Sequence, residues 1–205
     1  MRLLARWRPA LNSQGLLNAL SQLSDEEWAD VIIRSAEDLS YVGFQLPRVA
    51  DPSVQRRYNT GTDSEHNLRS GFNFYRIVKS YTERCGRPLG PDSRVLDFGC
   101  GWGPVIRFFL KDVRGENLYG IDVDRLVIRV CRRDMVYGSY SVNRRWPPTK
   151  FAANTFDLVY AFSVFSHLPE DLHLRWVEEL ARILKPGGLL VVTTLGRSFI
   201  RESIS

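Results

Sequence analysis

Residues 95–103 read Val-Leu-Asp-Phe-Gly-Cys-Gly-Trp-Gly, and this stretch decides the fold. A short apolar run ends in an acid, and three glycines then alternate before an amphipathic segment. This order predicts a buried strand, a tight turn and the start of a helix. Glycine lets the backbone of such a turn approach a ligand closely, because a Cβ atom would collide with it. The pattern therefore predicts a nucleotide-like ligand over the carboxyl end of a parallel strand.

The spacing of Gly99, Gly101 and Gly103 separates this turn from the usual dinucleotide fingerprint. That fingerprint reads G-x-G-x-x-G and is followed by an acid about 20 residues on. Here Asp97 stands just before the turn. A carboxylate in this place suits a ligand with a positive group and would repel a pyrophosphate. The pattern therefore argues against an NAD-dependent oxidoreductase.

A second acid follows the next apolar run. Asp122 comes directly after Leu118–Ile121, roughly 20 residues beyond the turn, where an acid can accept hydrogen bonds from both ribose hydroxyls. The alternative is that Asp122 or Asp124 only caps the following helix. Asp124 suits the cap, which leaves Asp122 for the ribose and Val123 to pack on the adenine face.

The rest of the chain alternates strands with helices, which predicts an α/β fold with a doubly wound, Rossmann-like parallel sheet and helices on both faces. We expect strands at 94–98, 117–121, 139–143, 156–161 and 189–194, and helices at 104–113, 124–137 and 170–184.

The N-terminal part is less regular. Residues 1–23 are polar and indicate an arm. Ser24 and Glu27 have capping-box spacing and predict a helix over 25–39. A turn-rich stretch follows, and an apolar stripe then predicts a buried helix over 65–84. We expect two units, an N-terminal arm and helical cap at 1–64 and a ligand-binding domain at 65–205.

Four elements in this order resemble the class I S-adenosylmethionine-dependent methyltransferase family. They are the glycine turn, Asp122, the run Phe156-Asp157-Leu158-Val159, and the turn Leu184-Lys185-Pro186-Gly187-Gly188. The resemblance covers about residues 66–195 and is far more specific than any one motif. It implies that S-adenosyl-L-methionine is the cofactor, with Asp97 and the three glycines around its methionine end.

The run from Ser163 to Glu170 resembles bacterial methyltransferases associated with glycan systems. This implies a small-molecule or sugar-containing acceptor. It also implies that Asn143 contacts adenine and that Ser163 and Phe165 lie on the cofactor side. For Phe165 the alternative is simple core packing.

Two further residues have open roles. His167 follows the fourth expected strand and has a suitable pKa for a general base, if the acceptor must lose a proton; the alternative is a structural hydrogen bond at a helix start. Arg69 is a candidate partner for the cofactor carboxylate, and the alternative is a solvated surface arginine. Tyr41, Arg48, Arg56, Arg57 and Tyr58 are candidates for shaping the acceptor site.

Composition sets wider limits. The chain has 205 residues, a net charge of +5 and three cysteines with no CxxC pair. We expect reduced thiols in a cytoplasmic protein without a membrane segment or signal peptide. The three histidines lack metal-ligand spacing, so we expect no metal site. The arginines are scattered, which does not favour nucleic acid as a partner; an RNA methyltransferase and a non-catalytic cofactor-binding protein remain the alternatives.

The C-terminal end departs from the family pattern. Members usually have seven strands, and only 11 residues follow the strand expected at 189–194. The last two strands are therefore expected to be absent, whether the chain is incomplete or differs from the family. The strand at 189–194 would then form a hydrophobic edge, which predicts a homodimer through that edge.

Overall fold

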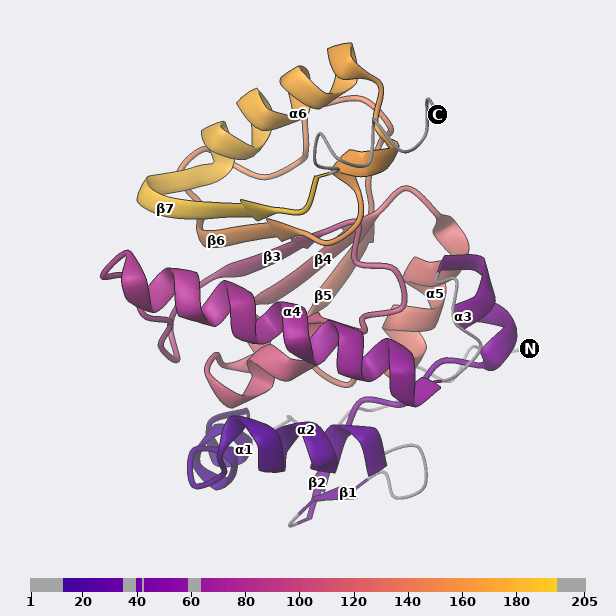
Figure 1. Ribbon diagram of the computed structural model, residues 1–205, viewed down its shortest axis with the longest axis vertical. Helices are drawn as coiled ribbons and strands as arrows, with labels where there is room; N and C mark the ends of the chain where they lie inside the picture. Colours follow the sequence, from indigo (N-terminus) through magenta and orange to yellow (C-terminus); the bar gives the residue numbers. More distant parts are fainter. Residues whose placement is uncertain (1–12, 35–39, 42, 59–63, 195–205) are drawn as a thin grey trace, which may run out of the picture.

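The computed structural model describes residues 13–34, 40–41, 43–58 and 64–194. Its centre is a five-stranded parallel sheet with the strand order β5-β4-β3-β6-β7 (Figure 1). The strands are β3 (Val95–Phe98), β4 (Leu118–Asp122), β5 (Ser139–Val142), β6 (Phe156–Ala161) and β7 (Leu184–Val192). This confirms the predicted α/β class, and β7 begins five residues earlier than expected.

Side chains of β3 alternate between two cores. Val95 belongs to the core on the side of α4 (Ser64–Arg84), whereas Leu96 and Phe98 belong to the core beneath α6 (Glu170–Ile183). Successive residues of a strand point to opposite faces, so both faces must be covered. Figure 1 shows α4 and α6 on opposite sides of the sheet.

Three more elements complete the side of α4. The helix α5 (Arg125–Asp134) connects β4 with β5, as expected between parallel strands. Helices α1 (Ser13–Leu20) and α2 (Asp25–Arg34) pack into the same core through Leu16, Leu20 and Trp28. The prediction of an irregular arm is therefore wrong for α1, because its leucines are fully buried.

The predicted capping box at the start of α2 is confirmed. The Ser24 backbone N–H donates to Glu27 Oε2 over 2.7 Å, and the Glu27 N–H donates to Ser24 Oγ over 3.1 Å. The two bonds satisfy backbone donors that the first helical turn leaves free. The predicted extension of this helix over 35–39 lies outside the described residues.

Three short elements lie between α2 and α4 in the described residues. A small antiparallel pair, β1 (Ser40–Tyr41) and β2 (Phe44–Gln45), precedes the helix α3 (Pro52–Tyr58). The sequence indicated only turns here. Gln55 of α3 donates hydrogen bonds to Ser64 Oγ over 2.7 Å and accepts one from Asn67 Nδ2 over 3.0 Å. These bonds fix α3 against the start of α4.

The predicted helix at 104–113 is wrong. A 3-10 helix, η1 (Ile106–Lys111), replaces it, and the residues Ile106–Leu110 are all buried. An amphipathic α-helix would expose one face, whereas this segment is enclosed by the sheet and by α1, α2 and α4. Tertiary packing therefore overrides the helical pattern. Two other 3-10 turns, η2 (Gly115–Asn117) and η3 (Phe165–His167), stand before β4 and before α6.

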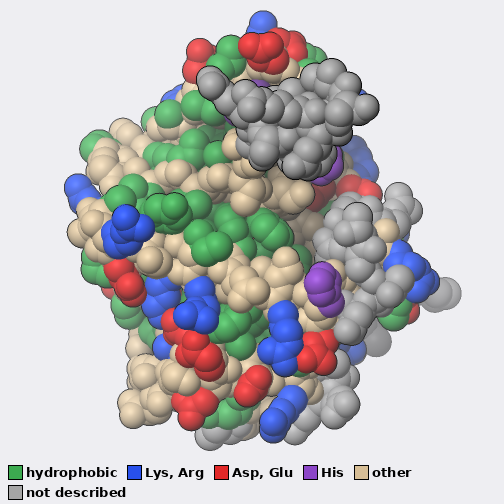
Figure 2. Space-filling view, in the orientation of Figure 1, with side chains coloured by type: hydrophobic (Ala, Val, Ile, Leu, Met, Phe, Trp, Pro, Cys, Tyr) green, Lys and Arg blue, Asp and Glu red, His purple; other side chains and the backbone are tan. Residues whose placement is uncertain are grey.

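The described sheet has two edges, β5 and β7. Side chains of β7 from Leu189 to Val192 are half-buried. On the face that carries α4 and β7, hydrophobic side chains form a band, and charged side chains gather mainly below it (Figure 2). No helix in the described part of the chain is long and apolar enough to cross a bilayer.

Candidate functional site

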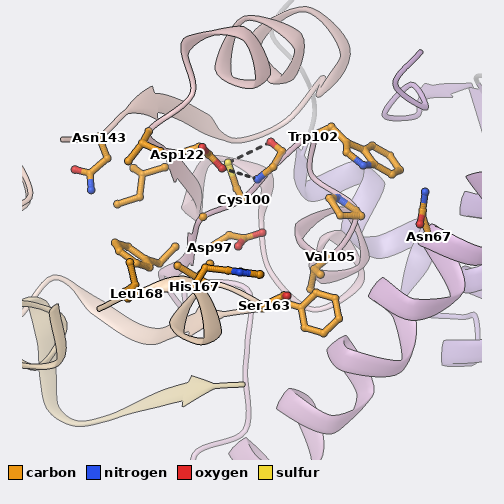
Figure 3. Close-up of a pocket in the computed structure, with 18 of the residues that line it drawn as sticks. Asn67, Asp97, Cys100, Trp102, Val105, Asp122, Asn143, Ser163, His167 and Leu168 are labelled. Atoms are coloured by element: carbon orange, nitrogen blue, oxygen red, sulfur yellow. Dashed lines mark hydrogen bonds between the residues drawn. The ribbon is translucent and has the colours of Figure 1, made fainter. Parts of the chain in front are cut away.

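A cavity of about 770 Å³ opens at the carboxyl ends of β3, β4 and β6. Figure 3 shows Asn143 and Leu168 at one end, Asn67 and Trp102 at the other, and His167 between them. The carboxyl edge of a parallel sheet is where this fold class places ligands. The cavity size falls within the range of about 300–1,000 Å³ that is usual for small-molecule sites.

The first acid of the site is Asp97 of β3. Its side chain is 2% exposed and accepts a hydrogen bond from the Tyr160 hydroxyl over 2.9 Å. The pKa of Asp97 is raised to about 8, mainly by burial and also by the charge of Asp122, while the bond from Tyr160 opposes this rise. No ion pair of the described residues compensates this carboxylate. It is therefore prepared to receive a cation.

The second acid is Asp122 at the end of β4. Its Oδ2 accepts the Gly101 N–H over 3.0 Å, and its Oδ1 accepts the Asp124 N–H over 2.9 Å. Burial raises the pKa of Asp122. Asp124 itself caps α5 by accepting the Leu126 N–H over 2.6 Å, as predicted. Asp124 thus provides the cap, and Asp122 lines the cavity.

The glycine turn leaves part of the cavity floor, between the two acids, without side chains. Gly99 has φ +80°, and a Cβ there would lie 2.3 Å from Val164 Cγ2. Gly101 has φ +50°, and a Cβ there would meet nothing within 4 Å. Gly101 also lines the cavity. Gly99 is thus required by packing, whereas Gly101 leaves free the space that a ligand can fill.

Several other predicted residues line the same cavity, namely Val123, Asn143, Ser163 and His167. The backbone of Asn143 donates to the Asp122 carbonyl over 2.8 Å, which fixes its position beside the second acid. Ser163 has φ +58° and donates its N–H to Thr193 Oγ1 over 2.7 Å. A non-glycine residue in this region is uncommon and often marks a functional site.

Three residues that were predicted to bind the cofactor do not line the cavity. Gly103 continues the turn, and a Cβ there would lie 3.0 Å from Met135 Sδ. Phe165 is 2% exposed and packs in the core against Phe98 and His173, so the core-packing alternative describes its position. Arg69 is exposed and forms an ion pair with Glu65 over 2.7 Å, so its position fits the alternative of a solvated arginine.

Sequence reasoning missed part of the lining. From the turn and the strand ends come Trp102, Pro104, Phe162 and Val164; from α6 and the segment before it come Leu168 and Trp176; from α4 come Asn67 and Ser70. The apolar residues of this set have no distinct sequence signal, because an apolar residue is normally predicted to lie in the hydrophobic core. Among the described non-glycine residues that line the cavity, only Ser163 has a left-handed backbone. No group of three or more His, Cys, Asp or Glu side chains in the described residues is placed to hold a metal ion.

Residues 95–188 match the protein family described as "Methyltransferase domain". The chain is 31% identical over 157 residues to the sterol 24-C-methyltransferase of Schizosaccharomyces pombe, an alignment covering 68% of this chain and 40% of that protein. It is 30% identical over 112 residues to the ubiquinone biosynthesis O-methyltransferase of Xanthomonas campestris pv. campestris, covering 53% and 45%. The chain spans less than half the length of these curated relatives.

Solved structures show the same fold. A putative sarcosine dimethylglycine methyltransferase from Galdieria sulphuraria superimposes with a TM-score of 0.52 at 18% identity, covering 87% of this chain and 64% of that one. The PH0226 protein from Pyrococcus horikoshii gives 0.52 at 21% identity, covering 76% and 68%. The amino pentose methyltransferase CalS10 from Micromonospora echinaspora, solved with S-adenosylmethionine bound, gives 0.50 at 19% identity, covering 63% and 51%.

The sheet order, the glycine turn and the two strand-end acids define an α/β protein of the nucleoside-binding type. The family match and the relatives make the assignment more specific. Residues 95–188 are similar to the methyltransferase domain family, and this match and the relatives support a class I S-adenosylmethionine-dependent methyltransferase.

Proposed function

We propose that this chain binds S-adenosyl-L-methionine and is the cofactor-binding part of a methyltransferase for a small-molecule or sugar-containing acceptor. One observation supports this most directly. Asp97 and Asp122, at the ends of neighbouring parallel strands, line one cavity on either side of the side-chain-free turn at Gly101. The cofactor has a sulfonium, an ammonium and two ribose hydroxyls, and this set of groups fits two carboxylates and bare backbone.

Different residues bind different groups of the cofactor. Asp122 accepts the ribose hydroxyls, and its existing bonds from the Gly101 and Asp124 backbone hold both oxygens in place beforehand. Asp97 pairs with the ammonium at the methionine end. Val123, which is 59% exposed, covers the adenine together with Asn143. Such preorganisation lowers the entropy lost on binding.

When bound, the cofactor supplies a methyl group already activated by its sulfonium. The remaining catalytic work of the chain is positioning and exclusion of water. Figure 3 shows the imidazole of His167 extending into the cavity below Asp97. From there His167 removes a proton from an acceptor hydroxyl or ammonium group. A base of this kind contributes roughly 10²–10⁴-fold in rate.

Calorimetry with S-adenosylhomocysteine tests the proposal. We expect saturable binding to the unmodified chain and a loss of about 10- to 100-fold in affinity for Asp122→Asn and Asp122→Ala, because bonds to a charged carboxylate contribute about 1.5–3 kcal/mol. The matched control is Asp30→Asn, which removes an exposed acid of α2 outside the cavity. Unchanged affinity in both Asp122 variants would contradict the ribose assignment, and no binding to the unmodified chain would contradict the whole proposal.

We also infer self-association through β7. This strand forms an edge of the described sheet, and its half-buried hydrophobic side chains continue along that edge. Edge strands with free backbone groups pair readily with another chain. Light scattering should show a mass that rises with concentration toward that of a dimer. A constant monomer mass across the micromolar range would exclude this.

A further inference from the structure

One end of the cavity differs in charge from its floor. The floor has the two acids, Asp97 and Asp122. The end formed by α3 and α4 is lined by Arg56, His66, Asn67 and Ser70, which we call the basic wall. None of the described residues that α3 and α4 contribute to the lining is acidic. Positive and polar groups therefore face the space beyond the two acids.

The nearby acids of the described residues do not line this wall. Glu65 is bound by Arg69 on the outer surface of α4. Asp51 lies close enough to Arg56 for an electrostatic interaction, but its carboxylate accepts the N–H and the hydroxyl of Ser53. Arg56 and His66 are exposed at the cavity, so a ligand can reach them.

A buried cation lies behind this end of the cavity. Arg107 is 0% exposed, and among the described residues it donates hydrogen bonds to neutral acceptors, including the carbonyl oxygens of Gly103 at 2.7 Å and Arg48 at 3.3 Å. Burial lowers the pKa of Arg107 to about 10, which still leaves it charged at neutral pH. The acid whose charge acts on it, Asp134, is held by Arg133 through two bonds of 2.6 and 2.7 Å.

Trp102 connects this cation with the cavity. The Arg107 guanidinium lies 4.7 Å from the centroid of the Trp102 ring, and Trp102 lines the cavity. Arg107 Nη1 and Trp102 Nε1 are both buried without a hydrogen-bond partner. A buried cation without a carboxylate bonded to it is costly, and an anion nearby reduces that cost. Figure 3 shows Trp102 and Asn67 at the same end of the cavity.

We propose that the basic wall, together with Trp102 and Arg107, selects an acceptor that has an anionic oxygen group, a carboxylate or a phosphate. The inference rests on the proposed function, since it takes the floor as the cofactor's place. Asp97 pairs with the ammonium of the cofactor. The basic wall is then available to bind the acceptor. His167 lies between the two ends, where an acceptor held at the basic wall would present its nucleophilic atom.

Indole NMR tests this directly. The chain saturated with S-adenosylhomocysteine is titrated with inorganic phosphate and D-glucuronate, with D-glucose as the uncharged match for glucuronate, at constant ionic strength. The Trp102 indole N–H is assigned among the five tryptophans by Trp102→Phe. We expect saturable shifts of this signal with both anions and none with glucose. Arg56→Gln should weaken anion binding by about fivefold, as expected for an exposed ion pair.

The matched control is Arg69→Gln, which removes an arginine from the outer surface of α4 and should leave anion binding within about twofold. Equal responses to glucuronate and glucose, or no saturable anion binding, would overturn the proposal. It would also be overturned if Arg56→Gln weakened S-adenosylhomocysteine but not its decarboxylated analogue, because the wall would then hold the cofactor carboxylate. Failure of the unmodified chain to bind S-adenosylhomocysteine contradicts the proposed function instead, and the same anion titration of the unliganded chain still tests the wall.

Discussion

The floor of the cavity and the basic wall are built differently. The floor comes from the carboxyl ends of β3 and β4 and from the turn after β3. Asp97 is buried and bonded to Tyr160, and Asp122 is half-buried and bonded to backbone N–H groups. The wall comes from α3 and α4, and Arg56 and His66 are exposed. A floor whose geometry is set by the sheet suits a constant ligand, the cofactor. A wall of exposed side chains on helices suits the variable ligand, the acceptor.

The largest effect should separate two glycines of the floor. Gly99→Ala places a Cβ against Val164 in a left-handed backbone, and we expect a loss of about 2–5 kcal/mol in the free energy of unfolding. Gly101→Ala meets no neighbour and has only the cost of a left-handed alanine, about 1–2 kcal/mol, so the fold should remain while the new methyl group reduces binding of S-adenosylhomocysteine. Urea denaturation and calorimetry measure the two effects. Equal destabilisation by both substitutions would contradict the assignment of Gly99 to packing and of Gly101 to ligand binding.

The second prediction concerns pH. The pKa of Asp97 is raised to about 8 from an ordinary value near 3.8, so the folded chain binds this proton more tightly than the unfolded chain. Stability should therefore fall as pH rises from about 4 to 8, by at most about 1.4 kcal/mol per pH unit from this group. Asp97→Asn should remove this slope, which urea denaturation at a series of pH values measures.

The same carboxyl group links ligand binding to protons. An ammonium beside Asp97 favours the carboxylate, so binding of S-adenosylhomocysteine below pH 8 should release a proton. Calorimetry in two buffers with different ionisation enthalpies measures that release. Asp97→Asn should abolish the proton release, and a wall variant such as Arg56→Gln should leave it unchanged. Persistence of the release in Asp97→Asn would assign it to another group.

A smaller effect is expected at Tyr160. Its hydroxyl bond lowers the pKa of Asp97, so Tyr160→Phe should move the midpoint of the proton-linked binding to higher pH. Loss of this single buried bond should cost about 1–3 kcal/mol of stability, since an acceptor is left with one partner fewer. A midpoint that moves to lower pH, measured by the same calorimetry, would contradict this role.

The smallest effect should be at Arg69. This side chain is 57% exposed and pairs only with Glu65 one turn away on the same helix, among the ion pairs described. Surface pairs of this kind contribute about 0.3–0.5 kcal/mol. Arg69→Gln should therefore change the affinity for S-adenosylhomocysteine by less than about twofold. A larger loss would indicate that Arg69 binds the cofactor carboxylate. It would also weaken the distinction between the outer surface of α4 and the side of α4 that lines the cavity.

The residues of the floor could be predicted from the sequence because their sequence signals are local. A strand, an acid and a glycine turn stand next to one another along the chain, and parallel strands bring their carboxyl ends to one edge. The same locality explains the success with the capping box and with the Asp124 cap. Phe165 was assigned to the cofactor side from a motif resemblance instead. Such a motif does not determine whether the ring faces the cavity or the core.

The sequence by itself therefore determined the sheet, its neighbouring strands and the two acids at their ends. Tertiary structure alone decided that 106–111 winds as a 3-10 helix, that Arg107 is buried behind Trp102, and that α3 and α4 form the end of the cavity. The physical reason is the distance along the chain over which each interaction acts. Hydrophobic period and turn chemistry act over a few residues, whereas burial on all sides and the meeting of α3 with the turn at Trp102 depend on contacts between segments far apart in the chain.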